Sequence, residues 1–433
     1  MYLERQLSNI KVKEGINKML DESMAHYREI IQSAAQLMSV YFHKPIHFSK
    51  VIQVSEPERR NVILRLLIDN PTTEMPRSLI FKKTVTETNK FASASHETEI
   101  EQLSRFAHDW AGIEFLTQIG NNHCPHFYAG SLEYKFILIE DLGPLHPSLV
   151  GPLTRSSSVV HLRDAKSALI SYVRRLGKMH ADTVGKYDQF TSILNRIYPR
   201  ALRYISIPEI DGAEVLKQFK LMTGDKSKEL HQEIQDILEF SKSSSDFHVF
   251  LHGDICPDNV YYQGSEMRLI DFEFSDFGNA LIDGVYLRMH MPSCWCSKAV
   301  PEAVLHRMEA VYREELKVKI SASVDDDIYR TQLTYACAYW LLRTMLQLEK
   351  MALIDHEWIC PSGSVDSDSE WDPKENAFRP RILSRILAFI ACAKKTGELP
   401  NLCEASTRLL SQLKKFWPET RYIDFFSVFR DLR

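Results

Sequence analysis

The sequence lacks a continuous apolar run long enough to cross a membrane, an excess of positive charge and an internal repeat. Its most apolar candidate, residues 382–393, is short and is interrupted by Arg385, and residues 1–15 are too polar for a secretory signal. The formal net charge of -4 gives no sign of the basic surface of a nucleic-acid-binding protein. These absences predict a cytoplasmic protein whose partners include neither a membrane nor a nucleic acid.

Cysteine is present, but without the spacing of a disulfide framework or a metal site. The eight cysteines are scattered and most have apolar neighbours, which predicts buried free thiols in a reducing compartment. Cys294 and Cys296 lack the two-residue spacer of a zinc knuckle, and they have no second pair or suitably placed histidines. We therefore expect neither disulfide bonds nor a structural zinc ion.

The most informative stretch of the chain is a predicted β-hairpin with acidic residues at both ends. Residues 260–262 and 267–270 have the composition of strands and are separated by a turn. Asp254 and Asn259 precede the first strand and Asp271 follows the second, so the three side chains can meet at one edge of the hairpin. Two carboxylates and an amide are hard oxygen ligands of the kind that Mg2+ accepts.

The pattern His-Gly-Asp-x-x-x-x-Asn, followed by Asp-Phe-Glu, resembles the catalytic and metal loops of the aminoglycoside phosphotransferase and choline kinase superfamily. These proteins are protein-kinase-like kinases of small molecules. The resemblance implies that Asp254 orients or deprotonates the attacking hydroxyl and that Asn259 and Asp271 hold Mg2+ on the phosphates of ATP. It also implies that Asp283 is buried and braces the catalytic loop. The structural alternative is that these residues cap a turn and end a strand, but such a turn has no need of an amide and a carboxylate at both neighbouring loop ends.

Upstream, strands are predicted at residues 51–54, 62–68 and 79–81, joined by connections too short for helical crossovers, so the sheet should be antiparallel. In the superfamily such a sheet covers the nucleotide, and Lys82 falls where a strand delivers the lysine that contacts the α- and β-phosphates. The glycine-rich loop of many kinases is absent, because residues 51–64 contain no glycine. The resemblance therefore assigns no residues to the cradle around the phosphates.

Residues 93–119 have the apolar spacing of a helix, and their start resembles the superfamily helix whose glutamate pairs with the ATP lysine. The match assigns this role to Glu99. Glu97 and Glu101 are rivals on other faces of the helix, and Asp109 is a more distant one. The structural alternative for each of them is a solvated acidic helix face.

Residues 136–143 read as a strand that runs into a glycine and resemble the hinge of the superfamily. By this resemblance, the main chain of Glu140, Asp141 and Leu142 binds the edge of the adenine base. Because those bonds depend on the backbone, the identity of the three side chains constrains them little.

Beyond the hinge the pattern is mostly helical, with an expected break near Gly224. The 433 residues, 44% of them hydrophobic, suffice for two or three domains or lobes. We expect an α+β chain with a bilobal, protein-kinase-like fold: an antiparallel sheet N-lobe and a mainly helical C-lobe. The expected segments are an N-terminal helical segment at 1–45, the N-lobe and hinge at 46–143, and the C-lobe at 144–433. Within the first segment, apolar residues recur at helical spacing over residues 16–41, which predicts an amphipathic helix.

The leading hypothesis is an ATP- and Mg2+-dependent phosphotransferase that acts on a hydroxyl of a small molecule. An alternative is a catalytically weak or inactive nucleotide-binding interaction protein, which the glycine-free loop favours. A metal-dependent hydrolase that uses His252, Asp254, Asp271 and Asp276 is disfavoured, because such sites usually draw on several histidines. The sequence identifies neither the acceptor nor the oligomeric state. The acidic loop at 361–380 is explained by solvation at least as well as by attraction of a cationic substrate.

Overall fold

A computed structural model of the chain describes residues 28–55, 60–84, 98–143, 148–243, 245–263, 266–349, 370 and 377–432. The chain divides into two compact units, Met1–Gln102 with Pro125–Leu142, and Leu103–Cys124 with Gly143–Arg433. Most of helix α2 (Glu99–Ile119) therefore belongs to the second unit. The expected segment limits at residues 45 and 143 stay a prediction.

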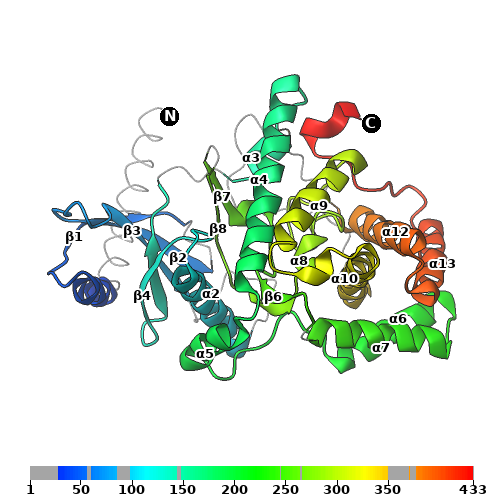
Figure 1. Cartoon of the computed structure of the whole chain (residues 1–433), viewed down its shortest axis with the longest axis horizontal. Helices are drawn as coiled ribbons and strands as arrows, with labels where there is room; N and C mark the ends of the chain where they lie inside the picture. Colours follow the sequence, from blue (N-terminus) through cyan, green and yellow to red (C-terminus); the bar gives the residue numbers. More distant parts are fainter. Residues whose placement is uncertain are drawn as a thin grey trace, which may run out of the picture. The chain divides into compact units, whose positions relative to one another are not determined.

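The first unit is built on a five-stranded antiparallel sheet in the order β1-β2-β3-β5-β4 (Figure 1). Its strands are β1 (Phe48–Gln53), β2 (Asn61–Ile68), β3 (Ser78–Thr84), β4 (Phe127–Ser131) and β5 (Phe136–Glu140). Along β2, Leu64, Leu66 and Ile68 are buried while their neighbours are partly exposed, which is the two-residue period of a strand with one face in a core. The predicted antiparallel sheet is confirmed, whereas β4 was not expected from the sequence.

A helix over residues 28–42 supplies the other side of this core. Its residues Ile30, Ala34 and Met38 recur at four-residue intervals and pack in one cluster with Leu66 and Phe81 of the sheet. The predicted amphipathic helix is thus confirmed over the part that the structure describes. The rest of it, residues 16–27, lies outside the described residues.

The second unit is mainly helical. Its longer helices, besides α2, are α4 (Val159–Thr183), α5 (Tyr187–Ile197), α6 (Glu209–Thr223), α7 (Lys228–Lys242), α9 (Glu302–Leu316), α10 (Asp326–Leu346), α12 (Phe378–Thr396) and α13 (Pro400–Phe416). Gly224 ends α6 in the left-handed conformation, with φ of 73°, where the sequence predicted a break. The predicted fold class, an antiparallel sheet followed by a mainly helical part, is confirmed. Among the helices that the structure describes, none is both long and apolar enough to span a membrane.

Two short antiparallel pairs lie within the helical unit. β7 (Val260–Gln263) pairs with β8 (Glu266–Leu269), from Val260 opposite Leu269 to Gln263 opposite Glu266, and this is the predicted hairpin. β6 (His248–Leu251) pairs with β9 (Asp276–Asn279), which was not predicted as a strand. A short helix, α8 (Leu281–Gly284), follows β9 directly. These elements carry the candidate site.

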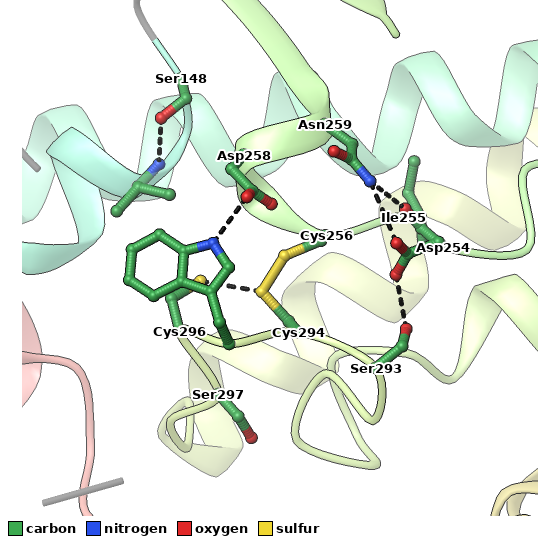
Figure 2. Close-up of a disulfide and its surroundings, with 12 residues drawn as sticks. Ser148, Asp254, Ile255, Cys256, Asp258, Asn259, Ser293, Cys294, Cys296 and Ser297 are labelled. Atoms are coloured by element: carbon green, nitrogen blue, oxygen red, sulfur yellow. Dashed lines mark hydrogen bonds between the residues drawn. A yellow bond between two sulfur atoms is a disulfide. The ribbon is translucent and has the colours of Figure 1, made fainter. Parts of the chain in front are cut away.

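The cysteines depart from the expectation at one place. Cys256 and Cys294 form a disulfide (Figure 2), so the prediction of free thiols is wrong for this pair. The other described cysteines are buried and free: Cys124, Cys296, Cys337, Cys392 and Cys403. A separation of 38 residues without a repeating pattern carries no pairing signal, so the bond is visible only once the chain is folded.

Candidate active site

The catalytic loop begins where β6 ends, and hydrogen bonds with Asp283 and Ile270 hold it in place. The Asp283 carboxylate accepts the N–H of His252 at 2.7 Å and that of Gly253 at 3.3 Å, which confirms its predicted bracing role. His252 Nε2 lies 2.9 Å from the carbonyl oxygen of Ile270 and so joins this loop to the loop after β8. Gly253 has a φ of 78°, and a Cβ there would lie 2.2 Å from the carbonyl oxygen of Phe274. Only glycine fits this position without distortion.

Asp254 and Asn259, predicted from one motif, meet in the structure. Asn259 Nδ2 donates to the carbonyl oxygen of Asp254 at 2.9 Å and to its carboxylate Oδ2 at 3.3 Å. A short 3-10 turn, Pro257–Asn259, brings the amide back toward the carboxylate. Because both bonds use the amide nitrogen, the amide oxygen points away from Asp254 (Figure 2). That oxygen has the chemistry of a Mg2+ ligand.

The hairpin places Asp271 at the same end as Asn259, since the N–H of Ile270 donates to the carbonyl oxygen of Asn259 at 3.0 Å. Asp271 has a φ of 68°, a left-handed conformation that is uncommon for residues other than glycine. Such strain often marks a functional position. The next residue, Phe272, donates its N–H to the buried Asp109 carboxylate of α2 at 2.8 Å. Asp109 thus holds the loop that presents Asp271.

Burial and the neighbouring charges bring the pKa of Asp254 close to neutrality. The pKa of the Asp254 carboxyl is raised to about 7, mainly by burial and further by the negative charges of Asp258, Asp271 and Glu273, while the hydrogen bond from Ser293 opposes the rise. A pKa near neutrality suits a group that takes a proton from a hydroxyl. A cation bound among several carboxylates also reduces the repulsion between their negative charges.

Two hydroxyl groups that sequence reasoning missed stand at the carboxylate of Asp254. Ser293 Oγ donates to Asp254 Oδ1 at 2.6 Å (Figure 2), and Tyr286 Oη lies 2.9 Å from Ser293 Oγ. Both come from the segment after α8, more than thirty positions along the chain from Asp254. Neither residue belongs to a recognised motif. The only sequence signal is that both follow the Asp271 loop along the chain.

The candidate nucleotide residues Lys82 and Glu99 fall in the first unit. Lys82 is partly exposed on β3, between Ile63 of β2 and Ile137 of β5 in the ladder. Glu99 is exposed in the first turn of α2. Of its rivals, Glu101 forms a capping box with Thr98, whose N–H donates to its carboxylate at 2.7 Å, and Glu97 lies outside the described residues. The phosphate contact of Lys82 and its pairing with Glu99 stay predictions.

The hinge side chains take part in the sheet. The Glu140 carboxylate accepts the N–H of His126 at 3.1 Å. Asp141 accepts from Arg65 Nε and from Ser78 Oγ, each at 2.6 Å. These contacts fix the end of β5. Adenine binding at Glu140, Asp141 and Leu142 stays a prediction.

Asp276, a ligand in the disfavoured hydrolase hypothesis, is buried and forms an ion pair with Arg203, at 2.6 Å between Nε and Oδ2. His180 is fully buried and hydrogen-bonds Tyr312 Oη through Nδ1 at 2.7 Å. Both residues therefore serve packing and charge balance within the fold. Neither adds a ligand to the group around Asp254.

Comparison with known proteins agrees with the motif. Residues 211–315, which span both loops, match the phosphotransferase enzyme family and so confirm the resemblance read from the sequence. No curated protein matches the chain.

Solved structures are similar at lower levels. A choline kinase from Cryptosporidium parvum Iowa II is 15% identical, with 84% of this chain and 93% of that chain covered and a TM-score of 0.42. An amicoumacin kinase in complex with AMP-PNP and Ca2+ is 16% identical, with 87% and 96% covered and a TM-score of 0.41. At these scores the likeness carries no argument about activity or substrate.

Proposed function

Because residues 211–315 match the phosphotransferase enzyme family and the chain resembles small-molecule kinases, we propose that it transfers the γ-phosphate of ATP to a hydroxyl of a small molecule. The observation that carries the proposal is the Asp254 carboxylate, oriented by Asn259 and placed among acidic neighbours. A carboxylate in this setting can accept the proton of an attacking alcohol. A cytoplasmic location stays a prediction.

The donor set suits Mg2+ on ATP as cofactor. Asn259 offers an amide oxygen and Asp271 a carboxylate, both hard ligands, at the end of one hairpin. When bound, Mg2+ supplies charge neutralisation on the phosphates. We propose that Lys82, held by Glu99, contacts the α- and β-phosphates and that the main chain of residues 140–142 binds adenine.

Binding and turnover of ATP by variants test this function. We expect Asp271→Ala to weaken Mg2+-dependent ATP binding in calorimetry, because it removes a metal ligand. Asp254→Ala should leave binding within a few-fold and lower transfer to a pool of hydroxyl compounds by on the order of 100-fold or more. An Asp254→Asn variant that equals the wild-type chain in every turnover assay would instead identify a nucleotide-binding protein without this chemistry.

A further inference from the structure

The hydroxyl of Ser293 occupies a position on Asp254 that an attacking alcohol needs. Its Oγ donates to Asp254 Oδ1 at 2.6 Å, the distance expected of a strong charge-assisted bond. Ser293 is exposed, although its neighbours Pro292 and Cys294 are buried. Its hydroxyl is therefore both in contact with the candidate base and open to solvent.

The surrounding groups direct the serine proton toward the carboxylate. Asp254 Oδ2 faces the amide of Asn259 at 3.3 Å, so Oδ1 is the oxygen that takes the serine proton. Tyr286 Oη lies 2.9 Å from Ser293 Oγ and 3.5 Å from Asp254 Oδ1, so its hydroxyl faces both the serine and the carboxylate. A nucleophile beside a base that a third group orients is the general pattern of an activated hydroxyl.

The segment that carries Ser293 is fixed by several independent contacts. The disulfide joins Cys294 to Cys256 of the catalytic loop (Figure 2). Trp295 Nε1 donates to Asp258 Oδ2 at 2.6 Å. From α12, the buried Arg381 donates to the carbonyl oxygens of Cys294 and Trp295 at 2.8 and 2.9 Å. The contacts of the two residues that follow Ser293 thus fix its position beside Asp254.

We propose that Ser293 is a site of self-phosphorylation in which the chain acts on its own hydroxyl in the place of an external acceptor. The inference rests on the proposed phosphotransferase function. Ser293 Oγ forms a bond to the γ-phosphorus of ATP, the bond from that phosphorus to the bridging oxygen of ADP breaks, and the serine proton passes to Asp254. The products are phosphoserine and ADP, and no further reactant is needed.

The new phosphate stands beside Asp254, because the Ser293 hydroxyl that carries it donates to that carboxylate. Because a phosphoserine carries close to two negative charges at neutral pH, repulsion drives it away from the carboxylates. Each chain is modified once at this position, because Ser293 has a single hydroxyl.

The test incubates the full-length chain with MgATP and measures intact mass and the modified peptide by mass spectrometry. We expect a single phosphoryl group on Ser293, formed at a rate per molecule that does not depend on protein concentration. Ser293→Ala should abolish the modification, Ser293→Thr should retain it because it keeps a hydroxyl, and Asp254→Asn should slow it by on the order of 100-fold or more.

Ser297 provides the matched control. It lies in the same segment, but its hydroxyl bonds to the carbonyl oxygen of His290 and not to Asp254. Ser297→Ala should therefore be phosphorylated like the wild-type chain. Phosphorylation that persists in Ser293→Ala would overturn the assignment. Loss of phosphorylation in both Ser297→Ala and Ser293→Thr would also overturn it.

A calorimetric titration with MgATP and a turnover assay with pooled hydroxyl compounds, run on the same samples, separate the two proposals. Transfer to an external acceptor without any phosphate on Ser293 rejects self-phosphorylation and leaves the phosphotransferase function standing. A chain that neither binds MgATP nor transfers phosphate rejects both.

Discussion

At the scale of single residues, the buried His123 makes the stability of the helical unit depend on pH. His123 is 1% exposed, and its Nε2 lies 2.8 Å from the carboxylate of Asp182. Burial lowers the pKa of His123 from 6.5 to about 4, although the bond to Asp182 opposes the shift. The folded protein therefore keeps this ring neutral where the unfolded chain protonates it.

The sign of the resulting pH dependence follows by linkage. With a folded pKa below the unfolded value, stability is complete above about pH 6.5 and is lost as the pH falls toward 4. Between about pH 7 and about pH 5, we expect the unfolding free energy of the wild-type protein to fall by about 2 kcal/mol more than that of the His123→Gln variant. Urea denaturation of both proteins at the two pH values measures it. Other buried histidines act equally in both proteins, so parallel pH curves would contradict the assignment.

The same scale shows which site residues a sequence can reveal. Asp254, Asn259 and Asp271 could be predicted because the proposed roles of a proton acceptor and of metal ligands restrict residue type and spacing. The contacts of Ser293 and Asp109 were not predicted, although Asp109 was named as a possible partner of the lysine, because each contact joins residues far apart in the chain, as in the bond between Asp109 and Phe272. A tertiary contact of this kind leaves no local pattern.

At the scale of elements, amino-acid composition predicts those strands whose own residues favour extended structure. The β7–β8 hairpin was predicted because Val260, Tyr261 and Tyr262 are typical strand residues. β9, with the sequence Asp-Phe-Gly-Asn, contains three residues that are depleted in strands. It is extended because it pairs with β6, which is a non-local cause.

The disulfide joins two such elements, the catalytic loop and the segment after α8. Cross-linking residues 38 positions apart lowers the entropy of the unfolded chain, which typically stabilises a protein by about 2–4 kcal/mol. We expect the double variant Cys256→Ala with Cys294→Ala to lose an amount in this range in urea denaturation without reductant. Cys296→Ala, which leaves the bond intact, should lose less.

A reductant supplies the internal control for the disulfide. Wild-type protein denatured in dithiothreitol should fall toward the stability of the double variant, whereas the double variant itself should not respond. If the wild-type curve is the same with and without reductant, the two sulfur atoms are not bonded in solution.

At the scale of the whole molecule, the two units differ in their spectroscopic probes. All six tryptophans fall in the sequence ranges of the helical unit, and the sheet unit has none. Tryptophan fluorescence therefore follows unfolding of the helical unit alone, while far-ultraviolet circular dichroism follows both. The core of the sheet unit contains Phe81, which is fully buried with its ring centroid 4.7 Å from that of Phe136.

Phe81→Ala leaves a cavity in the sheet unit and should cost about 3–5 kcal/mol there. If each compact unit unfolds on its own, the variant shows an earlier transition in circular dichroism during urea denaturation and an unchanged tryptophan transition. Phe115→Ala is the matched variant in the helical unit, since Phe115 is equally buried and packs against Phe250, and it should move the tryptophan transition instead. Equal shifts of both probes in both variants would mean that the two units unfold as one cooperative structure, because destabilising either core would then lower the stability of the whole chain.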